Sequence, residues 1–172
     1  GVSVSLAEER GKMRESATEQ VPDSPPGMAI RHARPEEAAA VAGLIRRAFE
    51  QYRGRLTPPA AALDVTAATI GALMAAGPVL VAVADGALAG CVAVQNKGDF
   101  AYAGRLAVDP AARARGVGRA LMLAAEAEAK ALGRHRLRVD CRLVLTRNRH
   151  FFGRLGFREG AQRCHPGFAA PT

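Results

Sequence analysis

The spacing of apolar residues predicts an alternation of helices and strands from residue 28 onward. Apolar positions recur every three or four residues over 38–49, with charged residues between them, which predicts an amphipathic helix. Uninterrupted apolar runs over 79–84 and 87–94 predict two buried strands, and Asp85-Gly86 between them favours a tight hairpin. These segments indicate a layered fold that contains both element types.

The same patterns assign the other elements. Further strands are predicted over 28–33, 100–108, 137–143 and 157–164. Further helices are predicted after an N-cap at Asp64, between the 109–118 loop and Gly133, and after Thr146. The order β-α-α-β-β-β-α-β-α-β argues for helices packed on a central sheet, hence for a mixed α/β fold.

The first 27 residues differ in composition. Small polar and charged residues precede three prolines, a composition typical of a flexible tail. The stretch lacks the apolar run of a secretory signal, and no run of about 18 strongly apolar residues occurs in the sequence. We therefore expect a tail over 1–27, one globular domain over 28–172, no membrane partner and a soluble protein.

Charge and cysteine content narrow the classes of partner. The formal net charge is +8, but the arginines are spread without a dense run, aromatic residues make up 5% and Trp is absent. Nucleic-acid modules concentrate charge beside stacking aromatics, so this pattern argues against nucleic acid. Cys91, Cys141 and Cys164 show no pairing or metal-ligand spacing, which predicts buried reduced thiols and a cytoplasmic location. The four histidines are scattered, so no metal site is expected.

The strongest candidate for a binding site lies between residues 106 and 121. An apolar strand runs through a Pro turn into an Arg- and Gly-rich loop that opens a helix. Gly116 and Gly118 remove side chains where a ligand must approach the main chain, and the N–H groups of a first helical turn bind anions. We expect this loop to hold a pyrophosphate. The Gly-Lys-Ser/Thr ending of a P-loop and the third glycine of a dinucleotide fingerprint are both absent.

Two motifs in this order resemble those of one family. Arg113-x-x-Gly116-x-Gly118, preceded by Val108-Asp109-Pro110, resembles the cofactor loop of the GNAT superfamily of acetyl-coenzyme A-dependent N-acetyltransferases. At the family's distance, Asn148-Arg-His-Phe-Phe152-Gly-Arg-Leu-Gly156-Phe157 resembles the Asn…Tyr-x-x-x-Gly-Phe segment that closes the family's cofactor site. The order of elements over roughly 28–165 is similar as well.

The resemblance implies the GNAT fold, with a central mixed, largely antiparallel sheet of six to seven strands flanked by four helices. It also implies an acyltransferase that moves the acetyl group of acetyl-CoA to an amine by direct attack. In the family, the strand before the loop presents main-chain groups to the pantetheine arm. The cofactor-binding residues so implied are Leu106, Ala107, Val108, Arg113, Ala114, Arg115, Gly116, Val117, Gly118, Arg119, Ala120, Asn148 and Phe152.

Two positions depart from the family where proton transfer is needed. Phe152 stands where the family usually has a Tyr acid, and Phe has no proton to give. Arg105 stands where many members carry a carboxylate, and a cation cannot accept the amine's proton. Arg105 could recognise a carboxylate or phosphate on the acceptor, and the alternative is a solvated or sheet-edge arginine. Candidate catalytic bases are Tyr102, Asp140 and a water held by main-chain carbonyls. The alternative is that Tyr102 packs on its strand and Asp140 balances a neighbouring arginine.

The acceptor is less well defined. Residues 52–63 correspond to the connection that commonly shapes the family's acceptor pocket, which makes Tyr52 a candidate substrate contact. Arg53 and Arg55 favour a polar or anionic molecule. We expect a small-molecule primary amine. Protein N-termini or lysines are alternative acceptors, and a non-catalytic acyl-CoA sensor is an alternative function, because Phe152 and Arg105 replace the usual catalytic groups.

The family's last strand has no clear counterpart. His165 to Thr172 contain two prolines and a glycine, so the final strand is predicted to be short or missing, with at most a brief pairing over 168–170. Its absence would expose a sheet edge near the strand over 137–143. We hypothesise that a neighbouring chain in a homodimer, or residues beyond this sequence, completes the sheet.

Overall fold

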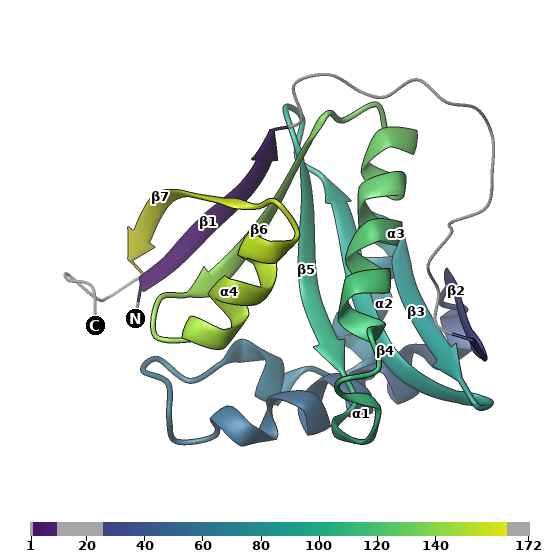
Figure 1. Cartoon of the computed structure of the whole chain (residues 1–172). Coiled ribbons are helices and arrows are strands. Elements are labelled where there is room, and N and C mark those ends of the chain that lie inside the picture. The colour runs from purple at the N-terminus through teal and green to yellow at the C-terminus, as the bar shows by residue number, and fades with distance from the viewer. Residues whose placement is uncertain (1, 10–25, 165–172) are drawn as a thin grey trace.

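The computed structural model describes residues 2–9 and 26–164, with side chains from residue 26 onward (Figure 1). The described strands form one sheet in the order β2-β3-β4-β5-β6-β1-β7. The strands are β1 (Val2–Glu9), β2 (Met28–His32), β3 (Val79–Ala84), β4 (Ala87–Asn96), β5 (Ala101–Val108), β6 (Arg136–Arg142) and β7 (Arg158–Cys164). The α-helices are α1 (Ala38–Phe49), α2 (Ala67–Ala76), α3 (Val117–Ala131) and α4 (Thr146–Arg154). Short 3-10 helices are η1 (Pro35–Glu37), η2 (Glu50–Tyr52), η3 (Ala61–Asp64) and η4 (Pro110–Ala112).

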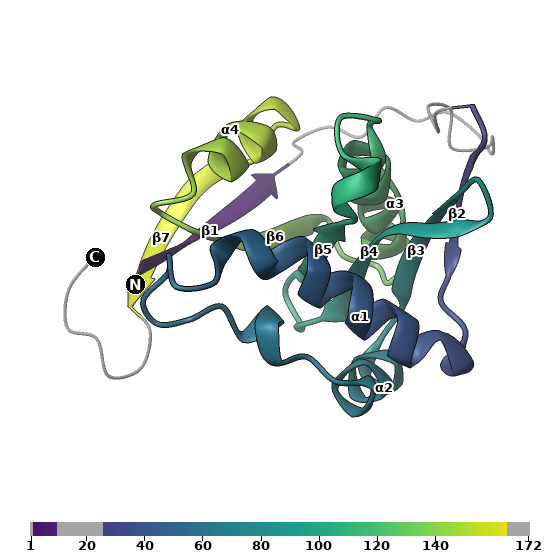
Figure 2. The same ribbon diagram turned by 90° about the horizontal axis from the view of Figure 1, so that it is seen from below.

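Helices cover both faces of the sheet, as the two views in Figures 1 and 2 show. On one face, Leu121 of α3 and Phe152 of α4 are buried in a core shared with β3 to β6. On the other face, Leu44 of α1 and Ile70 of α2 are buried against β3, β4 and β5. Pairing is antiparallel except between β5 and β6. The mixed, largely antiparallel α/β fold predicted from the sequence is confirmed.

β1 lies within the sheet, between β6 and β7 (Figure 1). It pairs antiparallel with both neighbours: Leu6 stands opposite Val139 of β6 and Glu159 of β7. The structure differs here from the expected tail, because residues 2–9 have the alternation of a strand and find partners on both sides. The chain's own β1 therefore covers the edge of β6 for which the sequence suggested a neighbouring chain. Residues 10–25 and the pairing expected over 168–170 lie outside the described residues.

Turn chemistry explains two element boundaries. Asp85 and Gly86 have φ values of 53° and 76°, and this pair of positive φ angles gives the tight hairpin expected between β3 and β4. The N-cap of α2 is Thr66, so the prediction of Asp64 as the cap is wrong. Thr66 accepts the N–H of Thr69 at 3.2 Å, and its own N–H donates to the Thr69 hydroxyl at 3.3 Å. Asp64 instead ends η3.

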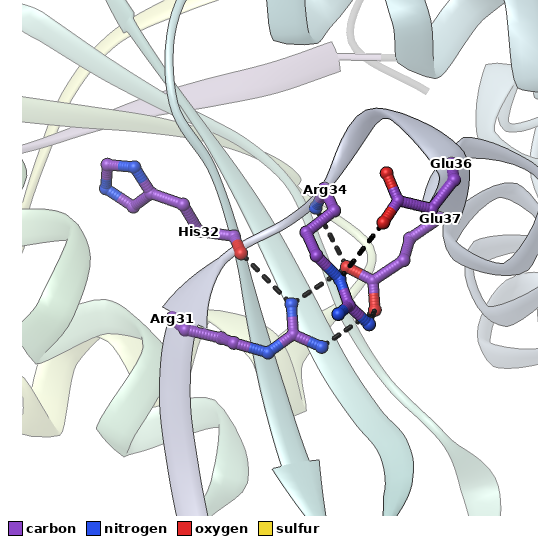
Figure 3. A network of polar contacts seen from close by, with 5 residues as sticks. All are labelled: Arg31, His32, Arg34, Glu36 and Glu37. Atoms are coloured by element: carbon purple, nitrogen blue, oxygen red, sulfur yellow. Dashed lines mark hydrogen bonds and ion pairs between the residues drawn. The ribbon is translucent and has the colours of Figure 1, made fainter.

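A polar network ties β2 to the start of α1 (Figure 3). Arg31 donates to both carboxylate oxygens of Glu37, at 2.7 and 2.8 Å. The backbone N–H of Arg34 donates to the same carboxylate at 2.8 Å. These charged hydrogen bonds hold the pKa of Glu37 well below its usual range, since each favours the ionised form. None of the described helices is long and apolar enough to cross a bilayer.

Candidate active site

β5 and β6 separate partway along their length. They pair in parallel only at Ala101–Leu137 and Tyr102–Arg138, although β5 continues to Val108 and β6 to Arg142. Figure 1 shows the two strands diverging toward the end of β5. Beyond Tyr102, this edge of β5 has no strand partner in the described sheet, so its main-chain groups can pair with an extended ligand. The segment 106–108, predicted to contact the pantetheine arm, lies on this edge.

A β-bulge interrupts the other edge of β5. Gly104 pairs with Ala93 and Ala107 with Cys91, so Arg105 and Leu106 together stand opposite a single residue of β4. Arg105 has a φ of 56°, a left-handed conformation that costs a non-glycine residue about 1 kcal/mol. Bulges and strained residues of this kind are concentrated beside active sites, where they redirect side chains.

The loop after β5 leads to the N-terminus of α3. Asp109 accepts the N–H of Ala111 at 3.0 Å and forms an ion pair with Arg47 of α1 at 2.8 Å. The guanidinium of Arg47 lowers the pKa of Asp109, which remains ionised as the anchor of the loop. Gly116 then begins α3 as a left-handed N-cap, with a φ of 77°. This geometry presents the first-turn N–H groups that the sequence predicts for anion binding.

Gly118 brings α3 close to both β5 and α4. A Cβ atom at this position would lie 3.3 Å from Cζ of Phe151 and 3.6 Å from Cγ2 of Val108. The glycine therefore permits a close approach of the α3 N-terminus to the open edge of β5. Phe151 is a residue that the sequence analysis missed; it adjoins Phe152, and only the packing of α4 distinguishes the two.

Phe152 belongs to the core. Its side chain is 7% exposed and makes edge-to-face contacts with Phe151 and Phe157. Asn148, one turn earlier on α4, is half-buried. The family position of Phe152 is thus occupied by a packed ring without a polar group.

The loop arginines have partners within the protein. Arg113 donates to the carbonyl of Ala48 at 3.1 Å, near the C-terminal end of α1, and to Gln51 at 3.4 Å. Arg115 forms an ion pair of 3.1 Å with Asp85 in the β3–β4 hairpin, and both side chains are well exposed. Arg113 therefore fixes the loop against α1, and Arg115 links the same loop to the β3–β4 hairpin.

Tyr102 and Asp140, both candidate bases, lie close together. Burial raises the pKa of Tyr102 to about 12, and the negative charge of Asp140 and its hydrogen bond to the phenol act in the same direction. The charges of Arg105 and Arg163 oppose the shift. The phenol of Tyr102 therefore keeps its proton at neutral pH and is available as a hydrogen-bond donor.

The connection after α1 is fixed above β6. The guanidinium of Arg142 donates to the carbonyl of Pro58 at 2.9 Å and to that of Thr57 at 3.5 Å. Tyr52 packs edge-to-face on Phe49 and borders a small cluster of Leu56, Ala60 and Leu63. The structure thus gives Tyr52 a packing role and identifies Arg142 as the anchor of this loop, which no local pattern predicts.

Two of the three cysteines are buried thiols. Burial raises the pKa of Cys91 to about 12 and that of Cys141 to about 11, so both remain thiols at neutral pH. Cys164 is exposed, which corrects the expectation that all three are buried. Within the part of the chain that the structure describes, His, Cys, Asp and Glu form no group of three that could hold a metal ion.

A parallel strand pair that opens beside a glycine-capped helix N-terminus defines an α/β protein suited to a phosphorylated cofactor. The sequence model of the acetyltransferase (GNAT) family matches residues 39–157. The match covers more than half of the chain, which therefore belongs to the GNAT family of acetyltransferases. The resemblance inferred from the two motifs is confirmed.

Solved structures share the fold. The PaiA N-acetyltransferase from Thermoplasma acidophilum, in complex with coenzyme A, has a TM-score of 0.66 and 18% identity over 76% of this chain and 89% of that one. A ribosomal-protein-alanine N-acetyltransferase from Escherichia coli has a TM-score of 0.64 and 21% identity over 78% of this chain and 79% of that one. A Drosophila protein has a TM-score of 0.67 and 21% identity over 94% of this chain, which spans 48% of its length. No curated protein matches the chain.

Proposed function

We propose that this chain transfers the acetyl group of acetyl-CoA to a primary amine of a small molecule. The observation that carries the proposal is the opening of β5 from β6 at Tyr102, with the N-terminus of α3 close to the end of the opened strand. A long, extended coenzyme with a pyrophosphate needs both parts: a strand edge for its arm and a helix N-terminus for its phosphates.

The residues at the opening fit such a coenzyme. Gly116 is left-handed, and a side chain at Gly118 would meet Phe151 and Val108, so glycine at both positions lets the N-terminus of α3 lie close to the end of β5. We assign the pyrophosphate to residues 113–120 and the pantetheine arm to the main chain of 106–108, with Asn148 as a polar contact. The coenzyme A bound by the Thermoplasma relative supports this choice of ligand.

Acetyl-CoA supplies a thioester with a good leaving group, so the protein's task is to orient the amine and move protons. We assign the carboxylate of Asp140 the role of accepting a proton from the attacking amine. We assign the phenol of Tyr102, which retains its proton at neutral pH, the role of proton donor where negative charge develops. Tyr102 would then replace the donor that is lost at Phe152.

A second candidate function is a non-catalytic acyl-CoA sensor, favoured by the buried, apolar ring of Phe152 at the family's usual acid position. Peptide acceptors are also included in the test, because the Escherichia coli relative acts on a ribosomal protein. We also propose a cytoplasmic location, as expected from the sequence.

The test is release of free thiol from acetyl-CoA against a panel of amines, amino acids, polyamines and peptides. Gly118→Trp places a bulky ring at the N-terminus of α3, against Phe151 and Val108, and Gly71→Trp is the control, because a Cβ at Gly71 would meet nothing within 4 Å. We expect amine-dependent release from the wild type and from Gly71→Trp only. Tight coenzyme binding without release for any amine would replace the transferase with the sensor.

A further inference from the structure

Arg105 is a half-buried cation, and one N–H of its guanidinium has no acceptor in the part of the chain that the structure describes. Its Nε atom is buried and has no hydrogen-bond partner among the described residues. Other arginines differ: Arg142 donates to the carbonyl of Pro58, and Arg113 donates to the carbonyl of Ala48. Because a buried charged N–H without an acceptor is costly, the arrangement indicates that a ligand supplies the acceptor.

The backbone holds Arg105 at the proposed site of reaction. It lies in the bulge of β5 with a φ of 56°. The β4–β5 pairs on either side of the bulge hold its backbone in this conformation. The ring of Tyr102 lies over Gly104, where a Cβ would be only 2.8 Å from Cε1 of the ring. The charge of Arg105 lowers the pKa of the Tyr102 phenol, so the guanidinium lies within electrostatic range of the phenol.

Further arginines of β6 and β7 lie on the face of the sheet that carries residues 138, 140 and 142. Leu137, Val139 and Cys141 of β6 are buried in the core with α3 and α4, so alternate residues 138, 140 and 142 lie on the opposite face. Across β1, Arg142 lies level with Arg163 of β7, and Arg138 lies level with Arg158. Among residues 138, 140, 142, 158 and 163, Asp140 is the one acid. The pKa of Tyr102 is raised by the charge of Asp140 and lowered by that of Arg163.

We propose that the acceptor amine carries an anionic group, a carboxylate or phosphate, which the guanidinium of Arg105 binds while the amine faces Asp140. This inference rests on the proposed transferase function and names its substrate class. A planar guanidinium holds either anion through paired N–H donors, and the surrounding arginines repel polyamines. The acceptor class is therefore amino acids or aminophosphates rather than polycations.

The experiment compares kcat/KM for matched amines that differ only in the anionic group: γ-aminobutyrate with 4-aminobutanamide, and phosphoethanolamine with ethanolamine. We expect the wild type to prefer an anionic member by about tenfold or more. Arg105→Gln should abolish the preference by raising KM for that member, with little change for the neutral one. Arg105→Lys should recover part of the preference. Arg154 is an exposed arginine on α4, and the control variant Arg154→Gln should retain the preference fully. The carboxylate and phosphate pairs distinguish the two sources.

Binding provides a readout that does not depend on turnover. Calorimetric titration of each amine into the protein saturated with coenzyme A should show tighter binding of the anionic member to the wild type and equal binding to Arg105→Gln. Equal binding of both members to the wild type, or a preference retained in Arg105→Gln, overturns the inference. If no amine is acetylated but the Arg105-dependent binding difference persists, the transferase function fails and the anion site stands.

Discussion

The ring of Phe151 on α4 lies against Gly118 on the first turn of α3, where a Cβ would be 3.3 Å from its Cζ. The adjacent Phe152 packs into the core, with its ring centroid 5.7 Å from that of Phe157 at an interplanar angle of 68°. Two consecutive aromatic residues therefore perform different tasks. Phe151 borders the proposed coenzyme path, and Phe152 joins α4 to the sheet.

Alanine substitutions should separate these tasks. Phe152→Ala removes a buried ring and should lower the free energy of unfolding by about 3–4 kcal/mol. Phe151→Ala should cost less stability, because its ring is only partly buried, but should weaken coenzyme binding. Denaturant unfolding and coenzyme titration of both variants provide the check. Equal losses of stability, with coenzyme binding unchanged in Phe151→Ala, would contradict the assignment.

The protonation state of Tyr102 can be measured directly. The chain has two tyrosines, Tyr52 and Tyr102, and no Trp, so Tyr52→Phe leaves one phenol in the ultraviolet spectrum. Burial and Asp140 raise the pKa of Tyr102 to about 12, and we expect almost no phenolate at pH about 10, where an ordinary tyrosine is half ionised. Circular dichroism at each pH confirms that the chain is folded. A midpoint near 10 in the folded chain would contradict the burial of the Tyr102 phenol beside Asp140.

The network at the start of α1 should make stability depend on pH. The pKa of Glu37 is lowered from 4.5 by its bonds to Arg31 and Arg34, so its contribution is fully present above that pH and is lost as the pH falls toward the folded-state value. Glu37→Gln should destabilise the chain by about 1 kcal/mol at pH 7 and by less at pH 3. Glu36→Gln is the matched control, because Glu36 is 68% exposed. A pH-independent difference between wild type and Glu37→Gln would contradict this account.

Local sequence signals predicted most of the fold, whereas long-range pairing was not accessible from them. The periodicity over 38–49 and the Asp85-Gly86 turn correspond to α1 and the β3–β4 hairpin because each depends on neighbouring residues. β1 also alternates, with Val2, Val4 and Leu6 at every second position, but its partners β6 and β7 lie at the other end of the sequence. No local pattern could place it between them.

In the candidate site too, local motifs were predictable from the sequence and long-range contacts were not. The glycine loop and Arg105 were recognisable because the motif is contiguous. The roles of Phe151 and Arg142, and the ionisation of Tyr102, depend on contacts between segments that are distant in sequence. The orientation of α4 decides which of two adjacent phenylalanines meets α3, and packing alone sets that orientation.

The position of β1 predicts a complementation experiment. Removing residues 1–9 exposes the edges of β6 and β7, and should lower the thermal midpoint and promote association between chains. A synthetic peptide of residues 1–9 should restore the midpoint, whereas the same peptide with Val4→Pro and Leu6→Pro should not, because proline cannot pair in a central strand. An unchanged midpoint after the deletion would show that β1 contributes nothing to the sheet.

The central claim is that the opening between β5 and β6 and the N-terminus of α3 form a coenzyme site. Calorimetric titration of acetyl-CoA into the wild type, Gly118→Trp and Gly71→Trp tests it most directly, since a Cβ at Gly71 meets no neighbour within 4 Å and one at Gly118 meets Phe151 and Val108. We predict saturable binding to the wild type and Gly71→Trp and none to a folded Gly118→Trp. Binding that survives in Gly118→Trp, or is absent from the wild type, would contradict it.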